Sequence, residues 1–505
     1  MTVLAAVKSR VNGLVTHDRS IQILWTAVII WTIVVGRLVV MRHENFGTFD
    51  YDLGIHDQAI WLMSRGMSFN TVRGMASLGH HATFSYYFLS PLSWLGAGPN
   101  TWNVLQCFAI ASGAVPLYCL ARRRFVAPVL ALMVGFGWLL QPWLSWFAQE
   151  TFHPEVMAMP FLLWGYVLID PLVHADDASG WNRRDVAALA VFVVAMAWKE
   201  DVALAVVMLG VAVFFMGRRR MARRLVGIGS AWFLLFGVWL VPAWAGGKAT
   251  YGGIYGQLGE SSTEVFVNSI IHPDLFWNQF TANNGGLYAA RLLLPFALLA
   301  LASPMLLLVT VPQFFANILT TVDFTYQPRF HYQAIPMVAL ALATVEGIHR
   351  LRGVRFLRRF GAGPFVLLFL FASVVGARGW GILPYSDQYR KGAWPLVGSD
   401  TSGWEAALRR VGPSDGVASH YLLVPHLTHR EQVYTFPNPW TNSYYGISPT
   451  DLGDATKVDW IVVLKGGLNE AAQKTLDDLL ASGEFGDAQE VNNVVSYRRL
   501  RPAGG

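Results

Sequence analysis

Charged residues are scarce in this sequence of 505 residues, and this scarcity excludes an ordinary water-soluble enzyme. Only 14% of the residues are charged and 54% are hydrophobic, whereas soluble domains average roughly 25% charged residues. Cysteine is almost absent, with only Cys107 and Cys119. On one helix these two would lie roughly 18 Å apart, too far for a disulfide bond. No low-complexity tract or internal repeat is evident.

Apolar runs of about 20 residues recur through the first three quarters of the chain, a pattern typical of a polytopic membrane protein. The first run is longer than a signal-peptide core and lacks a small-residue cleavage site, so we expect it to be retained as a span. We predict a mainly α transmembrane bundle of about eleven spans, at residues 21–41, 101–121, 125–145, 156–170, 185–198, 202–217, 225–243, 289–302, 304–320, 333–349 and 362–379.

Basic residues concentrate in alternate loops of this arrangement. They gather at Lys8 and Arg10, at residues 122–124, at 218–224 and at 350–359. Cytoplasmic loops of membrane proteins carry an excess of Lys and Arg, so the N-terminus is predicted to be cytoplasmic. The same rule accounts for the net charge of +6, which therefore does not indicate nucleic-acid binding.

The loops on the opposite side hold the residues that could take part in catalysis or ligand binding. They are Asp50, Asp52 and Asp57; His80 and His81; Glu150, His153 and Glu155; Lys199, Glu200 and Asp201; and Arg329 and His331. These clusters come from distant parts of the chain but share one predicted membrane face. We therefore expect them to converge on one site at the outer surface of a plasma membrane.

The densest acidic cluster lies in the first outer loop, 42–100, within "FDYDLGIHDQAIW". Asp52 precedes a predicted short helix, so it can serve simply as a helix N-cap. Alternatively, Asp52 or Asp50 is a general base at the boundary between water and membrane. Asp57 could hold a sugar or a neighbouring loop. Later in this loop, residues 84–96 are aromatic and apolar but short for a span, which predicts an interfacial helix.

The histidine clusters have a structural and a chemical interpretation. His80 and His81 are typical of a hydrogen-bonding element, and "HPE" (153–155) is typical of a helix start with proline at the first position. Together with Glu150, they could also hold a divalent metal ion. Their spacing matches no metal motif, so no cofactor is assigned and a metal site stays an open alternative.

Three consecutive charges interrupt an apolar stretch at "WKED" (198–201). Charges are costly inside a bilayer, so these residues should form a turn at its surface or line a cavity. In a cavity, Lys199 could hold an anionic phosphate. Arg329 and His331 in "QPRFHYQ" are similarly placed, and arginine suits bidentate phosphate contacts.

The composition changes after the last predicted span. Strand-like runs occur at 416–420, 432–436, 459–464 and 493–499, with helix-like segments between them. This alternation predicts a small α/β domain at 381–505, placed outside the membrane by the topology, after a membrane domain at 1–380. We expect it to bind an acceptor or to brace the membrane domain.

Several blocks resemble one widespread prokaryotic family of predicted multi-pass membrane proteins. The family has an F-D-L-G-I-x-D-Q signature, and "YDLGIHDQAIW" matches it with Tyr51 for the usual Phe and His56 for the usual Phe before Asp57. "LGHHATFSYYFLSPLSWL", "HPE", "WKED", "LLVPHLTHREQVYTFPNP" and "VDWIVVL" resemble its other blocks. The family's layout is similar to that of the GT-C integral-membrane glycosyltransferases.

The resemblance implies a glycosyltransferase that moves a sugar from a polyprenyl-phosphate donor to a cell-envelope glycan, lipid or protein acceptor. It makes Asp52 the base, with Lys199, Arg329 and His331 steadying the departing phosphate. Arabinofuranose and mannose are plausible sugars by analogy. A transporter or flippase is the main alternative, but it predicts charges near the midplane and repeated halves, which are not evident. A non-catalytic scaffold would tolerate replacement of the acids.

Overall fold

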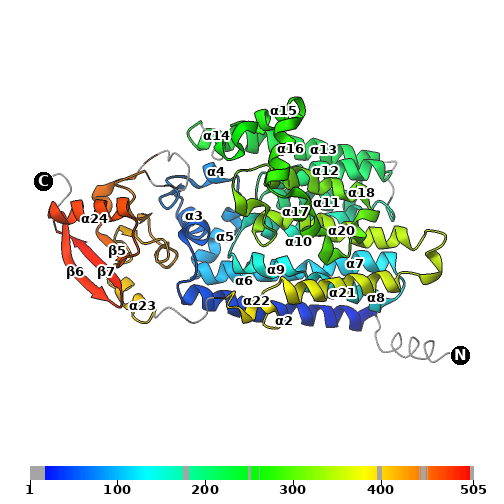
Figure 1. Ribbon diagram of the computed structural model, residues 1–505, viewed down its shortest axis with the longest axis horizontal. Coiled ribbons are helices and arrows are strands. Elements are labelled where there is room, and N and C mark those ends of the chain that lie inside the picture. The colour runs from blue at the N-terminus through cyan, green and yellow to red at the C-terminus, as the bar shows by residue number, and fades with distance from the viewer. Residues whose placement is uncertain are drawn as a thin grey trace.

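The computed structural model describes residues 17–174, 181–247, 252–260, 262–394, 401–442, 444, 451 and 453–500. Lys8 and Arg10, which contributed to the predicted topology, lie outside the described residues. Figure 1 shows an elongated molecule with a helical bundle on one side and a smaller sheet-containing part on the other. The first loop, with α3, lies between them.

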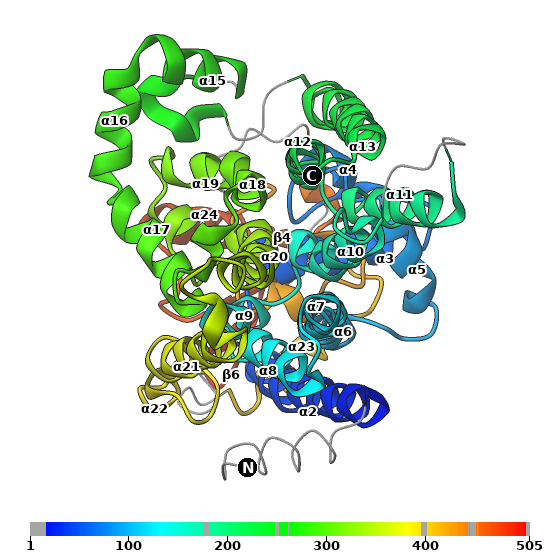
Figure 2. The same cartoon turned by 90° about the vertical axis from the view of Figure 1, so that its right-hand side faces the viewer.

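The bundle is built from apolar helices, several of which run side by side along the length of the molecule (Figures 1 and 2). Its main helices are α2 (His17–Glu44), α6 (Pro99–Ser112), α7 (Ala114–Arg124), α8 (Pro128–Leu139), α9 (Pro142–Gln149), α10 (Pro154–Ile169), α11 (Arg183–Met196), α12 (Val202–Phe215), α13 (Arg219–Trp232), α20 (Ala334–Leu351) and α21 (Gly363–Gly379). One continuous apolar core, from Leu24 to Trp394, joins them. The chain is therefore mainly helical, as the apolar runs predict.

Four of the described helices are long and apolar enough to cross a membrane: Arg19–Glu44, Pro99–Arg124, Arg219–Trp244 and His331–Leu351. The bent pair α8 and α9 would add a fifth, and Pro154–Ile169, Val202–Phe215, Pro304–Ile318 and Gly363–Gly379 are shorter apolar helices. A membrane protein is therefore supported, while the larger number of about eleven spans stays a prediction.

The region 289–302, predicted as one span, instead forms separate short pieces, whereas 304–320, also predicted as a span, forms consecutive pieces that run on as one apolar helix, Pro304–Ile318. They are α17 (Gly285–Leu293), η4 (Leu294–Phe296), η5 (Leu299–Ala302), α18 (Pro304–Leu307), η6 (Leu308–Thr310) and α19 (Val311–Ile318). The breaks follow from the backbone: Ala297 and Leu298 have positive φ angles of 54° and 59°. Pro304 and Pro312 each stand within the first two residues of a new helix, where a missing N–H is tolerated.

Further short helices connect these parts. They are η2 (Phe233–Leu240), which is π-helical, α14 (Val241–Trp244), η3 (Gly252–Leu258), α15 (Ser262–Ile271), α16 (Pro273–Ala282), η7 (Asp323–Tyr326), η8 (His331–Gln333), η9 (Arg358–Phe360) and α22 (Asp387–Arg390). Helices α15 and α16 project beside α17, away from α2 (Figure 2). Phe266, Ile270 and Trp277 are exposed on them, as expected of side chains that face lipid.

Helices α10 and α20 carry charged groups at both ends. At one end, His153 precedes α10 and His331 lies just before α20. At the other end, Asp170 follows α10, and Glu346 lies in the last turns of α20, where both bind Arg124 at 2.5 Å. The 16 residues of α10 separate these ends by about 24 Å. The apolar stretch between them packs into the core, so charge is confined to the two ends.

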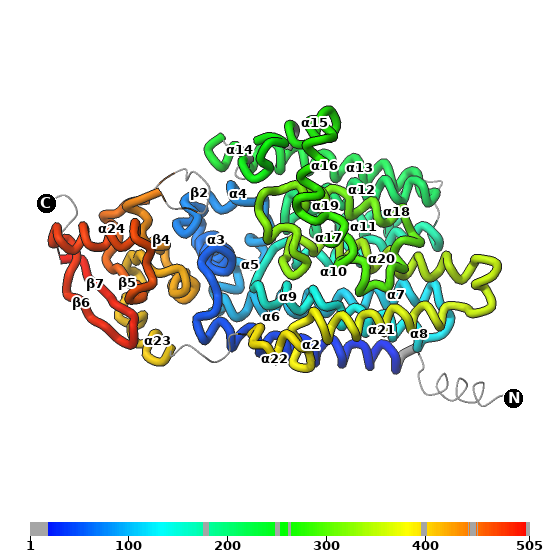
Figure 3. Tube along the Cα trace, in the orientation of Figure 1, coloured from blue at the N-terminus to red at the C-terminus, as the bar shows by residue number. Residues whose placement is uncertain are grey.

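The first loop forms a compact layer on the bundle (Figure 3). It contains η1 (Asp50–Gly54), α3 (Ile55–Met63), the small antiparallel pair β1 (Phe69–Asn70) and β2 (Met75–Ala76), α4 (Ser77–His80) and α5 (Tyr86–Ser93). On and beside α5, Tyr87, Phe88, Trp94 and Leu95 are exposed. The predicted short aromatic helix at 84–96 therefore exists, and its placement at the membrane interface stays a prediction.

A five-stranded mixed sheet forms the centre of the C-terminal part. Its order is β4 (Val433–Thr435), β3 (Val417–Ser419), β5 (Trp460–Leu464), β7 (Val494–Arg499) and β6 (Phe485–Val491). Strand β3 is parallel to β4 and β5, and β7 is antiparallel to β5 and β6. The helical elements are α23 (Trp404–Leu408), η10 (Val424–His426), η11 (Ala455–Lys457) and α24 (Glu470–Ala481). Four strands fall within the four predicted runs.

The first loop and the C-terminal part share one hydrophobic cluster. Phe46, Ile55 and Val72 of the loop pack with Leu423, Val424 and other buried side chains of the C-terminal part. Polar contacts reinforce this seam: the Thr71 hydroxyl donates to the carbonyl of Val433 at 2.7 Å, and the Asp50 N–H donates to the carbonyl of Tyr421 at 3.1 Å. The carboxyl end of β3 and the edge strand β4 are therefore docked against the loop that carries the acids.

Candidate functional site

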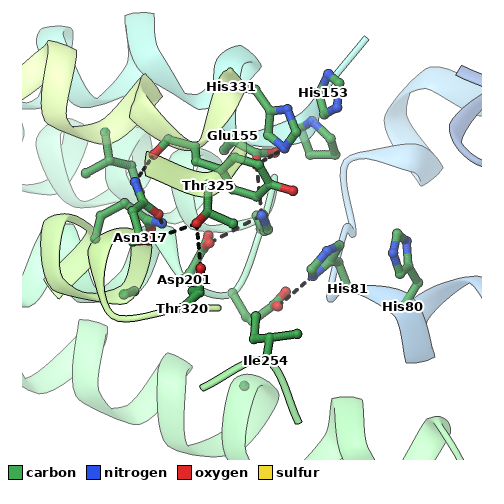
Figure 4. Close-up of a pocket in the computed structure, with 18 of the residues that line it drawn as sticks. His80, His81, His153, Glu155, Asp201, Ile254, Asn317, Thr320, Thr325 and His331 are labelled. Carbon is green, nitrogen blue, oxygen red and sulfur yellow. Dashed lines mark hydrogen bonds and ion pairs between the residues drawn. The ribbon is translucent and has the colours of Figure 1, made fainter. Parts of the chain in front are cut away.

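A cavity of about 890 Å³ lies where the first loop, the bundle and the C-terminal part meet. One part of its lining is polar and includes Asp52, His81, Lys199 and Asp201, while another is apolar and includes Leu204, Phe233, Val241, Val309 and Ile335. Figure 4 shows several of the polar side chains, with His153 and His331 beside Glu155 and with His81 beside His80. Such a volume is sufficient for a small-molecule substrate.

Asp52 reaches the cavity from the π-helical turn η1 and pairs with His153. The His153 Nε2 lies 3.4 Å from the Asp52 Oδ1, and about a quarter of the Asp52 side chain is exposed (26%). Burial raises the pKa of Asp52, but the nearby charges of His153, His331 and His56 outweigh it, so the pKa is lowered overall. The carboxylate is therefore ionised and accessible from the cavity.

His153 belongs to a stacked pair of imidazoles between carboxylates. Its ring lies 3.6 Å from that of His331, at an angle of 18°. The Nδ1 of His331 is 3.3 Å from Glu150, and its Nε2 is 3.6 Å from Glu155. Burial lowers the pKa of His153, but the neighbouring charges of Asp52, Glu150 and Glu155 raise it to about 9. At neutral pH a protonated His153 keeps Asp52 ionised.

Lys199 lies in the turn between α11 and α12 and also lines the cavity, so it matches both positions predicted for "WKED". Its Nζ is 2.8 Å from Glu155 and 3.3 Å from Asp201. Burial disfavours the charged amine, but these carboxylates hold the pKa of Lys199 well above its usual value. Burial raises the pKa of Asp201 more than Lys199 lowers it. Asp201 is therefore the carboxylate most easily neutralised beside Lys199.

His81 is oriented by Glu200. The Nδ1 of His81 is 2.8 Å from one carboxylate oxygen of Glu200, and the N–H of Ala82 donates to the other at 2.9 Å. Burial raises the pKa of Glu200, but His81 and Lys199 lower it to about 2. His80 is beside His81, with 4.4 Å between the ring centres, and His56 is hydrogen-bonded to the Tyr86 hydroxyl. His56, His80, His81 and Glu200 all line the cavity.

Asp50 and Asp57, the other acids of the first loop, are tied to the C-terminal part. Thr435 donates to Asp50 at 2.5 Å. Asp57 accepts from Trp102 at 2.6 Å and from Thr428, and it lies 3.2 Å from His429. Asp50 still lines the cavity, whereas Asp57 is buried outside its lining. The sequence allows Asp57 to hold either a sugar or a neighbouring loop. Its contacts with Thr428 and His429 match the second interpretation.

Every predicted binding residue lines the cavity except Glu150 and Arg329. Glu150 lies just behind it, where it accepts from the N–H of His331 at 2.5 Å. The guanidinium of Arg329 instead lies over the rings of Phe330 and Trp146, at 4.8 and 5.9 Å from their centres. Arg329 is therefore not positioned to contact a ligand in the cavity.

Sequence reasoning missed several lining residues. Asn317, Thr320 and Thr325 form a hydrogen-bonded group in which the hydroxyls of Thr320 and Thr325 are 2.7 Å apart. The signal was present, because polar residues within or beside a predicted span often face a cavity. Tyr421 was also missed, although it follows a predicted strand and the carboxyl ends of parallel strands often bind ligands.

A metal ion was an open alternative for the histidines and acids. Among the residues that the structure describes, no group of three or more His, Cys, Asp or Glu side chains is arranged to hold one. The ionisable side chains pair with one another instead, as Asp52 does with His153 and Glu155 with Lys199.

The alkaline pH dependence of stability tests the pairing of Asp52 with His153. Because the folded-state pKa of His153 is raised to about 9, its contribution is complete below the unfolded value near 6.5 and is lost as the pH rises through 9. We expect stability to decrease between pH 7 and 10, by about 3 kcal/mol at most from this group. Thermal unfolding in detergent measures this, and His153→Gln should flatten the dependence. An equally steep decrease in that variant would contradict the assignment.

The helical bundle, the long first loop and the docked C-terminal part together give a membrane-protein fold that is similar to that of GT-C proteins. Two structures of ArnT from Cupriavidus metallidurans show this likeness. The one bound to undecaprenyl phosphate has a TM-score of 0.53 at 14% identity and covers 94% of this chain and 97% of ArnT. The apo structure has a TM-score of 0.54 at 13% identity and covers 95% and 98%. These similarities concern the fold.

The chain belongs to the family described as "Predicted membrane protein (DUF2079)", which it matches over residues 42–496. An oligosaccharyltransferase from Archaeoglobus fulgidus, solved with a tethered acceptor peptide, is more distant, with a TM-score of 0.43 at 12% identity over 95% of this chain and 75% of its own. No curated protein matches the sequence.

Proposed function

We propose that this chain is a membrane glycosyltransferase that moves a sugar from a polyprenyl-phosphate donor to a cell-envelope acceptor. The observation that carries the proposal is an ionised, accessible Asp52 in a cavity that combines charged groups with an apolar lining from α12, η2 and η6. A lipid-linked sugar has the same combination of polar and apolar parts. The shared fold with ArnT, one of whose structures holds undecaprenyl phosphate, supports this donor class.

In the proposed reaction, Asp52 accepts the proton of an acceptor hydroxyl as its oxygen attacks the anomeric carbon of the sugar. The bond from this carbon to the phosphate oxygen breaks, and the polyprenyl phosphate departs with the bonding electrons. The phosphate is already a good leaving group, so positioning and charge are the main requirements. His153 holds Asp52 in its ionised form and in place.

Lys199 is the proposed partner of the donor phosphate. It already pairs with Glu155 and Asp201, which would repel an anion if both stayed charged. The raised pKa of Asp201 lowers the cost of neutralising that carboxylate, which would leave Lys199 with a net positive charge to offer. Arg329 has no role in this proposal because its guanidinium lies against Trp146 and Phe330.

The proposed topology places the cavity at the extracytoplasmic surface. The end of α10 and α20 opposite the cavity carries Arg124, and Arg218 with Asp185 lies beside it, since Arg218 donates to the carbonyl of Ile169 at 2.7 Å. Concentration of arginine at this end agrees with a cytoplasmic location. The C-terminal domain, proposed as 381–505, then lies outside the cell membrane, against the first loop.

Reconstitution into liposomes tests the proposed function. The purified chain is supplied with polyprenyl-phosphate-linked mannose or arabinofuranose and with a cell-envelope glycan extract, and the sugar transferred to the glycan is measured. We expect transfer that requires both donor and acceptor. Absence of transfer from every polyprenyl-phosphate donor, with donor counterflow across liposomes that lack acceptor, would instead show a transporter.

Replacement of Lys199 tests its role at the phosphate. We expect Lys199→Gln to raise the KM for the donor by about ten- to hundredfold, because a charged hydrogen bond contributes about 1.5–3 kcal/mol. Lys199→Arg keeps the charge and should retain most of the affinity. Kinetics at varied donor concentration measure the effect. An unchanged donor KM in a folded Lys199→Gln protein would remove this residue from phosphate binding.

A further inference from the structure

Two exposed aromatic side chains face each other at the seam between the first loop and the C-terminal part. Phe49 precedes η1, and Tyr421 lies two residues beyond β3. Their ring centres are 5.9 Å apart, and the planes are inclined by 35°. Both residues line the cavity although they are 41% and 39% exposed. Large aromatic side chains next to a cavity present a surface on which a ligand can stack.

Both rings are held in place by neighbouring groups. The guanidinium of Arg42 lies 5.4 Å from the centre of the Phe49 ring, and the ring of His420 lies 4.3 Å from that of Tyr421. The backbone hydrogen bond from Asp50 to the carbonyl of Tyr421 joins the two segments directly. These contacts restrict the two rings before a ligand arrives, which reduces the conformational entropy lost on binding.

The groups around this pair favour a neutral, hydroxyl-rich ligand. Asp50 and Asp52 follow Phe49 closely in the chain, and both line the cavity. Carboxylates accept hydrogen bonds from hydroxyl groups, and they repel phosphate and uronate groups. The guanidinium beside Phe49, that of Arg42, is buried and donates to the carbonyl of Gln149, and the other nearby cation, His153, is paired with Asp52. Aromatic faces can contact the C–H groups of a sugar ring, and carboxylates can accept hydrogen bonds from its hydroxyl groups. The combination therefore matches the apolar and polar surfaces of a sugar.

We propose that Phe49 and Tyr421 form the acceptor subsite and that the acceptor is a neutral carbohydrate, which stacks on these rings and presents a hydroxyl to Asp52. This inference rests on the proposed transferase function for the direction of the reaction. It also gives the C-terminal domain a defined role, because Tyr421 reaches the cavity from the carboxyl end of the parallel strand β3, the edge at which such sheets commonly bind ligands.

A binding experiment on the full-length protein in lipid nanodiscs tests the subsite without requiring turnover. The probes are neutral mannan and arabinan hexasaccharides, compared with an oligogalacturonate of the same length. We expect the neutral probes to bind and the charged one to bind more weakly. Phe49→Ala and Tyr421→Ala should each weaken neutral binding by roughly tenfold, whereas Phe49→Trp and Tyr421→Phe should retain it. The matched control is Phe88→Ala, an exposed aromatic on α5 that does not line the cavity.

The outcomes separate the subsite from the proposed reaction. Neutral binding that depends on both rings, without transfer from any polyprenyl donor, would support the subsite and overturn the proposed function. Sugar transfer with an acceptor KM that is unchanged in both alanine variants would overturn the subsite and leave the function standing. The subsite is also overturned if no neutral probe binds, or if an acceptor peptide or a lipid headgroup binds in a manner that depends on these rings.

Discussion

Asp52→Asn should lower kcat for sugar transfer by roughly 10²- to 10⁴-fold, the range that a positioned general base contributes. Asparagine has nearly the same shape as aspartate but cannot take a proton from the attacking hydroxyl. Asp52 is the acid of the first loop that is both accessible from the cavity and held ionised by His153. The KM for the donor should change little, because the proposed contact of the donor phosphate is Lys199.

The rate is measured in liposomes at saturating donor, with Asp274→Asn as the matched control, since Asp274 is exposed on α16. Asp57→Asn provides the sharper comparison. It should lower stability, because Asp57 binds Trp102, Thr428 and His429 at the seam, and it should retain activity in the fraction that stays folded. Full activity of Asp52→Asn would remove Asp52 from the mechanism, and loss of activity in a stably folded Asp57→Asn protein would transfer the role to Asp57.

The grouping of the polar residues could be predicted from the sequence because it depends only on the alternation of loops between the two membrane surfaces. Once the apolar runs are treated as helices that cross between two surfaces, every second loop must lie on the same side. Asp52, Lys199 and Glu150 come from three such loops, and the structure joins them through His153, His331 and Glu155. The pairing of each acid with a particular cation was not predictable, because it depends on distances that loop order does not define.

The different roles of Asp50, Asp52 and Asp57 could be assigned only from the structure. Asp50 and Asp57 are bound by Thr435 and Thr428, more than 370 residues later in the chain. Nothing in the local sequence distinguishes these carboxylates from Asp52. Arg329 was a reasonable phosphate ligand by residue type, but its guanidinium is placed by the neighbouring rings of Trp146 and Phe330.

Secondary structure was predictable where the pattern was strong. Strand β6 was missed because "FGDAQEV" is polar, and it is an edge strand that pairs only with β7. The predicted span 289–302 was too regular, since apolar composition cannot reveal where a helix is interrupted. Ala297 and Leu298 have positive φ angles, which break the helix here although both residue types ordinarily favour a helix.

Arg124→Met should destabilise the folded protein by about 3–5 kcal/mol, the cost of leaving buried carboxylates without their partner. Arg124 connects three helices: it ends α7 and contacts Asp170 after α10 and Glu346 in α20, both at 2.5 Å. All three side chains are almost fully buried. Tyr166 adds a hydrogen bond to Glu346 at 3.1 Å, and Arg123 contacts Asp170 at 3.1 Å, but neither can neutralise both acids.

A second variant separates the charge from the shape of this cluster. The triple replacement of Arg124→Met, Asp170→Asn and Glu346→Gln removes all three charges, so it should recover much of the lost stability, since a buried ion cluster is costly mainly when one sign is left alone. Arg355→Met, at an exposed arginine, is the control. Unfolding is followed with a thiol-reactive dye in a Cys119→Ser background, because Cys119 is partly exposed whereas Cys107 is buried in α6 and reacts only after the bundle opens. The same cluster also fixes the ends of α10 and α20 opposite His153 and His331, so the Arg124→Met protein should lose transfer activity at temperatures where it still resists unfolding. Unchanged stability of Arg124→Met would show that the two acids are neutral in the folded protein and that this end of the bundle is held by apolar packing alone.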